Sequence, residues 1–187
     1  MGRLKRGDPQ IVPRFAERVF SLAQQGRFPH FFGPQVTLVP VPGSSPLVQN
    51  GLWVPLLLAR ALRALALARD VAPILARVSA VRKSAIAAPG ERPTVQQHYD
   101  SFAAQIVAPA PIHIVLIDDV VTAGSTLLAA ASRIAEAYPE ASVRAFALIR
   151  TMSGVAVDQV VAPATGTIIS PCVGWIRPRG DRALRQP

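Results

Sequence analysis

The stretch IVLIDDVVTAGST, Ile114–Thr126, decides the fold of this chain. It begins inside an apolar run, Ile112–Ile117, that lacks the alternation of a half-exposed strand. Such a run indicates a strand covered on both faces, as in a parallel sheet. A helix is predicted over Thr126–Tyr138, and a second strand over Ser142–Ile149. Together these segments predict one βαβ unit.

The residues before this unit predict a further strand and helix. Val36–Val41 is a β-branched run typical of a buried strand, and the proline and glycine residues after it break the strand. Leu52–Ala68 is the longest apolar stretch and predicts a buried helix, with Asp70 and Pro73 marking its end or a turn beyond it. Ile11–Gln25 has apolar residues at helical spacing and predicts another helix. We therefore expect one α/β domain with a mainly parallel sheet flanked by helices.

Three further segments carry weaker patterns. Ile74–Val81 is compatible with a short strand. Ser84–Gln97 is polar and contains proline and glycine, which predicts a mobile loop, and Tyr99–Ala104 returns to ordered structure. Val155–Ser170 is rich in β-forming residues.

The chain of 187 residues has a net charge of +9 and an isoelectric point of about 11.3. Such a surface favours anionic partners, namely nucleic acid, acidic lipid or phosphorylated metabolites. Solubility combined with an arginine-rich genome explains the same charge equally well. No RNA-binding aromatic motif or zinc finger accompanies the charge, so direct nucleic-acid recognition is the less favoured reading.

The numbers and spacing of the cysteines and histidines limit which disulfides and metal sites the chain can form. The single cysteine, Cys172, excludes an intrachain disulfide and a cysteine zinc cluster. The three histidines are scattered without metal-ligand spacing. The N-terminus has positive charge without a following apolar segment, and no stretch is long enough for a bilayer span. We expect a cytoplasmic protein with no membrane partner.

The acid pair Asp118 and Asp119 follows the apolar run directly. In open parallel sheets the carboxyl ends of the strands face the ligand crevice. Two adjacent carboxylates there need hydroxyl donors, a cation or backbone amides, because leaving them buried and unpaired is costly.

The residues after the acid pair are small and lead into a helix, whose N-terminus offers free amides to a phosphate. They are Thr122, Ala123, Gly124, Ser125 and Thr126. The whole stretch therefore offers acceptors for a diol and donors for a phosphate, as a ribose 5-phosphate requires. A plain helix cap at the acid and a plain turn at Gly124 are the structural alternative.

The stretch resembles the phosphoribosyl pyrophosphate (PRPP) signature of type I phosphoribosyltransferases: four apolar residues, an acidic pair, two apolar residues, then a small, hydroxyl and glycine loop. The resemblance implies a Rossmann-type sheet with a small hood, formed here by about residues 1–35 and the C-terminal segment. It implies that Asp118 and Asp119 bind the ribose 2- and 3-hydroxyls, and that residues 122–126 cradle the 5-phosphate. It also implies a mobile loop over about residues 81–101.

Other segments resemble the ComF-like subgroup, and the likeness covers roughly residues 3–150. Val39–Gly43 resembles its PVP segment, Leu4–Asp8 its N-terminal motif, and Leu58–Leu62 its LARAL helix. Arg92 and Phe102 resemble the end of its mobile loop. The subgroup's N-terminal zinc ribbon and the basic run after PVP are absent here.

The resemblance implies that the loop formed by Val41, Pro42, Gly43 and Ser44 binds pyrophosphate. Because the basic run is missing, backbone amides around Gly43–Ser45 are the expected anion ligands.

The implied reaction is displacement of pyrophosphate from C1 of PRPP by a nitrogen acceptor, with a nucleobase or a related compound expected. Mg²⁺ is the expected cofactor, held through PRPP rather than by direct protein ligands. Arg82, Lys83 and Arg92 are the candidate cations for the departing pyrophosphate, and each is equally well explained as a solvated surface charge. His98 and Tyr99 are candidate loop contacts, although a lone histidine is more often structural.

Two other functions stay open at this level. One is a non-catalytic module that binds PRPP or a nucleotide and regulates another process. The other is a ComF-like accessory protein of DNA uptake or processing that uses its basic ends on nucleic acid. The resemblance also allows a homodimer.

Overall fold

The computed structural model describes residues 11–46, 51–82, 93–151, 166–169 and 184–186. The helices are α2 (Ile11–Gln24), α3 (Val54–Ala64), α4 (Val95–Asp100) and α5 (Ser125–Ala137). The strands are β1 (Gly33–Pro40), β2 (Ala68–Val71), β3 (Leu75–Arg77), β4 (Phe102–Ala104), β5 (His113–Val121), β6 (Ser142–Arg150), β7 (Thr167–Ile169) and β8 (Leu184–Gln186).

Four strands form a parallel sheet in the order β2-β1-β5-β6. The chain leaves β1 through α3 to reach β2 on one side, and it leaves β5 through α5 to reach β6 on the other side. The connections therefore diverge between β1 and β5, which makes this pair the topological switch point of the sheet. The α/β class and the parallel sheet predicted from the sequence are confirmed.

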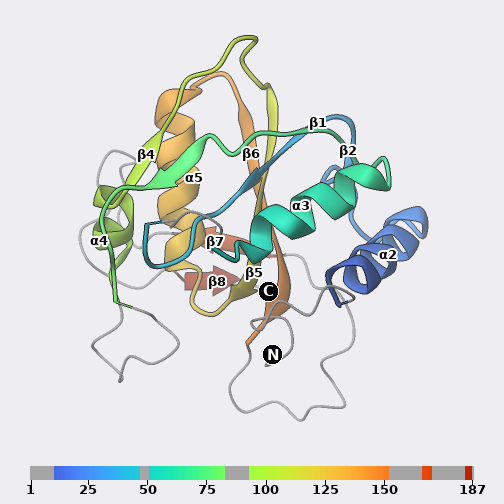
Figure 1. Ribbon diagram of the computed structural model, residues 1–187, viewed down its shortest axis with the longest axis horizontal. Coiled ribbons are helices and arrows are strands. Elements are labelled where there is room, and N and C mark those ends of the chain that lie inside the picture. Colours follow the sequence, from blue (N-terminus) through green and yellow to red (C-terminus); the bar gives the residue numbers. More distant parts are fainter. Residues whose placement is uncertain (1–10, 47–50, 83–92, 152–165, 170–183, 187) are drawn as a thin grey trace.

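Helices cover both faces of this sheet (Figure 1). Leu38, Val115 and Ile117 point to the face covered by α2 and α3. Their neighbours Val39 and Leu116 point to the other face, where α5 packs. Because side chains alternate along a strand, both faces can be buried only if the strand is apolar throughout. This explains the unbroken apolar run in β5.

The helix predicted over Leu52–Ala68 is shorter than expected. It spans Val54–Ala64, and Ala66 then adopts a positive φ of 58°. The chain reverses there, and Ala68–Val71 pairs with β1 as a parallel strand that includes Asp70. Pairing satisfies the backbone groups of β1, which outweighs the helical pattern of the side chains. The prediction that Asp70 lies at a helix end or a turn is therefore wrong.

The second half of the predicted mobile loop contains α4. Thr94 caps this helix: its hydroxyl accepts from the Gln97 N–H, and the Gln97 side chain accepts from the Thr94 N–H. The sequence Thr94-Val-Gln-Gln97 carries this capping-box signature, although a helix of six residues is too short to show periodicity. Residues 83–92 lie outside the described part of the chain.

Two smaller antiparallel pairs complete the described strands: β3 with β4, and β7 with β8. Of the predicted hood, residues 1–10 and 170–183 lie outside the described residues. Residues 11–35 are described: they include α2, which packs with α3 against the sheet, and the start of β1. The hood stays a prediction. None of the described helices has the length and apolarity needed to cross a bilayer.

The two neighbouring leucines of α3 offer a direct test of the layer assignment. Leu58 is 1% exposed and belongs to the core beneath α3, whereas Leu57 is 40% exposed. We expect Leu58→Ala to lower the free energy of unfolding by about 2–5 kcal/mol, because it removes buried methyl groups and leaves a cavity. Leu57→Ala is the matched control and should cost less than about 1 kcal/mol. Urea denaturation measures both, and equal losses would contradict the arrangement.

Candidate functional site

The carboxyl ends of β1 and β5 meet at the switch point. The register of the two strands ends at Pro40 and Ile117, and one more bond follows, from the Val41 N–H to the Ile117 carbonyl at 2.9 Å. Beyond it the chain after β1 turns away, while β5 continues through Asp118 and Asp119 in register with β6. The structure thus brings the acid pair and the predicted pyrophosphate loop to one edge of the sheet.

Three hydrogen bonds hold the loop of residues 41–45 by its backbone carbonyls. The Trp53 indole N–H donates to the Val41 carbonyl at 2.9 Å, and the Val81 N–H donates to the Ser44 carbonyl at 2.8 Å. The Arg77 guanidinium Nε donates to the Gly43 carbonyl. In a trans peptide the N–H points opposite to the carbonyl. The amides of Ser44 and Ser45 therefore point away from Arg77 and Val81, as an anion nest requires.

The acid pair occupies a strongly perturbed electrostatic environment. Burial, followed by the charge of Asp119, raises the pKa of Asp118 above its ordinary value, and the charge of Arg77 acts in the opposite direction. The Asp118 carboxylate accepts the Asp119 backbone N–H at 2.8 Å. Two nearby carboxylates disfavour the doubly ionised state. A ligand that donates hydroxyl hydrogens, or brings a cation, would relieve this cost.

The predicted phosphate loop forms the turn from β5 into α5. Thr122, Ala123, Ser125 and Thr126 are half-buried. Gly124 caps the helix with a φ of 90°, a conformation in the left-handed region that side-chain-bearing residues rarely adopt. The loop therefore places the free amides of a 13-residue helix at the end of the strand that carries the acid pair.

Ile168 of β7 lies against this turn. A Cβ added to Gly124 would meet the Ile168 Cδ1 atom at 2.8 Å, closer than carbon atoms approach without displacement. A residue far along the chain thus closes one side of the phosphate loop, and a side chain at position 124 would require Ile168 to shift.

Arg77 is a site residue that the sequence analysis missed. Its side chain is 5% exposed, lies over the Phe102 ring at 4.1 Å, and donates through Nη1 to the Ser101 hydroxyl. Burial lowers the pKa of Arg77 to about 10, and the charge of Asp118 opposes this shift. The Nη2 atom is buried without a hydrogen-bond partner. The signal in the sequence was an arginine inside the apolar segment Ile74–Val81.

His98 approaches the phosphate loop from α4. It is 2% exposed, and its Nε2 atom lies 3.3 Å from the Thr126 Oγ1 atom. Burial, followed by the charge of Arg77, lowers the pKa of His98 to about 4. The histidine therefore belongs behind the site and is neutral at physiological pH.

Of the three cations predicted for catalysis, the structure describes one. Arg82 is exposed and directly follows Val81, whose N–H holds the pyrophosphate loop. Lys83 and Arg92 lie outside the described residues, so their roles stay predictions. Within the part of the chain that is described, no group of three or more His, Cys, Asp or Glu residues could hold a metal ion.

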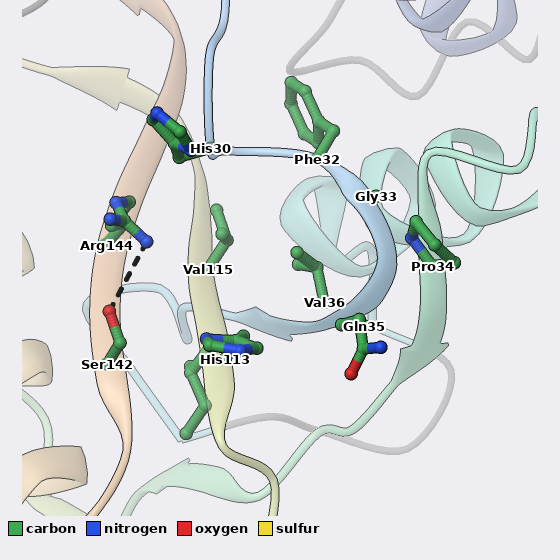
Figure 2. A pocket seen from close by; sticks show the side chains of 11 residues that line it. His30, Phe32, Gly33, Pro34, Gln35, Val36, His113, Val115, Ser142 and Arg144 are labelled. Carbon is green, nitrogen blue, oxygen red and sulfur yellow. Dashed lines mark hydrogen bonds between the residues drawn. The ribbon is translucent and has the colours of Figure 1, made fainter.

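A separate hollow lies at the opposite edge of the sheet. This cavity has a volume of about 340 Å³ and is lined by Val36, Val115, His113, Ser142 and Arg144, among others. Figure 2 shows the side chains that line it. These residues stand at the beginnings of β1, β5 and β6, whereas the acid pair stands near the carboxyl end of β5. The cavity is therefore not part of the candidate site.

Substitution of Gly124 tests the packing of the phosphate loop. We expect Gly124→Ala to lower the free energy of unfolding by about 1–2 kcal/mol through the backbone conformation and by about 1–3 kcal/mol through contact with Ile168. Gly26→Ala is the matched control, because Gly26 has a φ of 73° and open space around it. Urea denaturation separates the two contributions. A Gly124→Ala loss no larger than that of Gly26→Ala would contradict the Ile168 contact.

The pKa of Asp118 predicts how stability changes with pH. Because that pKa is raised in the folded protein, the folded state retains a proton that the unfolded chain releases, so stability falls as pH rises above the ordinary carboxyl value. We expect Asp118→Asn, neutral throughout, to melt at least about 3 °C above the wild type near pH 9, with a smaller gap near pH 5. Thermal melts monitored by circular dichroism measure the gap. Glu140→Gln, at an exposed acid, should show none, and a pH-independent gap for Asp118→Asn would contradict the assignment.

Comparison with known protein families identifies a domain in this chain. The family model of the phosphoribosyl transferase domain matches residues 54–171, from the start of α3 past the acid pair and the phosphate loop. No curated protein matches the chain significantly. The family model thus supports the resemblance to type I phosphoribosyltransferases, and membership of the ComF-like subgroup stays a prediction. Because the match covers more than half of the 187 residues and includes the stretch at the switch point, the chain belongs to the phosphoribosyl transferase domain family.

Proposed function

We propose that the protein transfers the 5-phosphoribosyl group of PRPP to a nitrogen acceptor and releases pyrophosphate. One observation supports the proposal: the acid pair, the helix-terminal loop 122–126 and the loop of residues 41–45 lie at the same end of the β1–β5 pair. A diol, a phosphate and a diphosphate are the three groups that PRPP presents around its ribose. The acceptor is proposed to be a nucleobase or a related nitrogen compound.

The proposed substrate placement follows from the donors and acceptors. The carboxylates of Asp118 and Asp119 would accept hydrogen bonds from the ribose hydroxyls. The amides of Gly124, Ser125 and Thr126 would donate to the 5-phosphate, with the helix dipole favouring the negative charge. The Ser44 and Ser45 amides would donate to the pyrophosphate. The ribose C1 would then lie between the two anchored anions.

In the reaction, the bond from C1 to the pyrophosphate oxygen breaks and a bond from C1 to the acceptor nitrogen forms. The bonding electrons leave with pyrophosphate, and the acceptor nitrogen loses a proton. Positive charge develops on the ribose ring, close to the carboxylates, and negative charge develops on the leaving group. Preorganised groups of opposite sign at both places lower the barrier.

Arg77 is proposed to support the leaving group. It holds the Gly43 carbonyl, which orients the loop amides, and its charge lies near the same loop. Arg82, with Lys83 and Arg92, is proposed to add positive charge over the pyrophosphate.

Mg²⁺ is proposed to be held through the oxygens of PRPP and its own waters rather than by direct protein ligands. The carboxylates of Asp118 and Asp119 would lie close to it and favour its positive charge. When bound, it would supply positive charge to the pyrophosphate and ribose oxygens. Relief of the repulsion between the two acids would favour its entry with PRPP.

Calorimetric titration with PRPP, with and without Mg²⁺, tests the proposal. We expect Mg²⁺-dependent binding, and the double variant Asp118→Asn/Asp119→Asn should weaken it at least roughly ten-fold, since two hydrogen bonds to charged groups are lost. Arg144→Ala is the control, because Arg144 lies at the opposite edge (Figure 2). Circular dichroism confirms that each variant is folded.

Transfer itself is then followed by ³¹P NMR during incubation with PRPP and a panel of nucleobases. Pyrophosphate released only in the presence of one acceptor supports the proposed reaction. Absence of PRPP binding at millimolar concentration overturns it. Binding without release on any acceptor supports the regulatory module instead.

A further inference from the structure

His98 is tied to both sides of the candidate site without facing it. On one side its Nε2 atom lies 3.3 Å from the Thr126 hydroxyl in the first turn of α5. On the other side its backbone carbonyl accepts the Ser101 hydroxyl at 2.6 Å, and that hydroxyl in turn accepts from Arg77. Arg77 holds the Gly43 carbonyl in the predicted pyrophosphate loop. Hydrogen bonds to the backbone and to the side chain of His98 therefore link residue 43 to residue 126 behind the site.

The protonation of His98 follows from its neighbours. The imidazole is buried and neutral, so one ring nitrogen carries a proton and the other does not. The Nδ1 atom has no hydrogen-bond partner. A buried N–H without a partner is rarer than a buried acceptor without one. The positive charge of the nearby Arg77 also disfavours an N–H at Nδ1. The proton therefore resides on Nε2, facing Thr126.

This tautomer determines what the Thr126 hydroxyl can do. A hydroxyl has one hydrogen to donate and two lone pairs to accept. If Nε2–H donates to Thr126 Oγ1, the hydroxyl keeps its own hydrogen for another acceptor. If Nε2 were unprotonated, the hydroxyl would donate to His98 and could offer a phosphate only lone pairs, which repel it.

We infer that His98 is a positioning residue, which donates from Nε2 to Thr126 and thereby directs the Thr126 hydroxyl hydrogen toward the phosphate of the substrate. This inference rests on the proposed function for the identity of the phosphate. The tautomer and the contact with Thr126 stand independently of it. His98 does not touch the substrate and acts through Thr126 alone.

The tautomer is tested on the protein without substrate. The chain has three histidines, so long-range ¹H–¹⁵N spectra resolve each imidazole. We expect His98 to show a protonated Nε2 and an unprotonated Nδ1 near pH 7, and to keep this form to below about pH 5. Thr126→Val should shift the His98 Nε2 signal and leave those of His30 and His113 unchanged. A protonated Nδ1 would overturn the inference.

Two substitutions of His98 separate the positions of its nitrogens. The side-chain amide of Gln reaches about as far as Nε2, whereas that of Asn reaches only as far as Nδ1. We expect His98→Gln to hold the PRPP dissociation constant within about two-fold of the wild type, and His98→Asn to raise it roughly three- to ten-fold, as loss of one neutral hydrogen bond does. In the His98→Asn background, Thr126→Val should add little, because the two residues act as one unit.

The outcomes distinguish this inference from its alternatives. Equal weakening by Gln and Asn, with equal loss of thermal stability, would show a merely structural histidine and overturn the inference. Additive effects of His98→Asn and Thr126→Val would also overturn it. If the wild type bound no PRPP, the proposed function would fail and the phosphate half of the inference with it, while the tautomer spectra would still decide the contact with Thr126.

Discussion

The site depends on where the parallel pairing of β1 with β5 stops. The two strands share a register up to Pro40 and Ile117, and beyond that point the chain after β1 leaves the pairing while β5 continues beside β6. The separation leaves backbone groups without strand partners, and they must be satisfied by side chains or by a ligand. Trp53, Val81 and Arg77 satisfy carbonyls on the β1 side. On the β5 side, the acids and the helix terminus remain directed at the same space.

The charged groups in this space, Arg77 and Asp118, lower the free energy of unfolding. Arg77 is buried, and Asp118 is held with a raised pKa, so neither group is in its most stable environment. A buried ion seldom stabilises a fold by itself, because loss of hydration offsets much of the Coulomb attraction. Such placement is characteristic of sites in which a ligand completes the pairing. Packing of Leu58, Leu116 and their neighbours supplies the stability that makes this tolerable.

The central βαβ unit could be predicted because its signals are local. The apolar run, the acid pair and the small residues of Ile114–Thr126 are contiguous, and each has a direct physical meaning. Arg77 was missed because its partner, the Gly43 carbonyl, lies 34 residues away, and nothing in the sequence joins the two. The strand over residues 68–71 was missed for a related reason: its pairing with β1 overrides a helical pattern of side chains. The link between His98 and Thr126 likewise required the packing of α4 on α5.

The order of pairing in the sheet also bears on how the site assembles during folding. In the β5–β6 pair, Ile114 meets Val143 across a short connection, whereas in the β1–β5 pair Val36 meets His113 across a much longer stretch of chain. Closing a longer loop costs more entropy and slows the contact. The β5–α5–β6 unit, with its acids and phosphate loop, is therefore expected to form early, and docking of β1 to be the slower event. The anion loop after β1 would then be the last part of the site to reach its place, so intermediates that retain β5, α5 and β6 would hold only half of the binding surface.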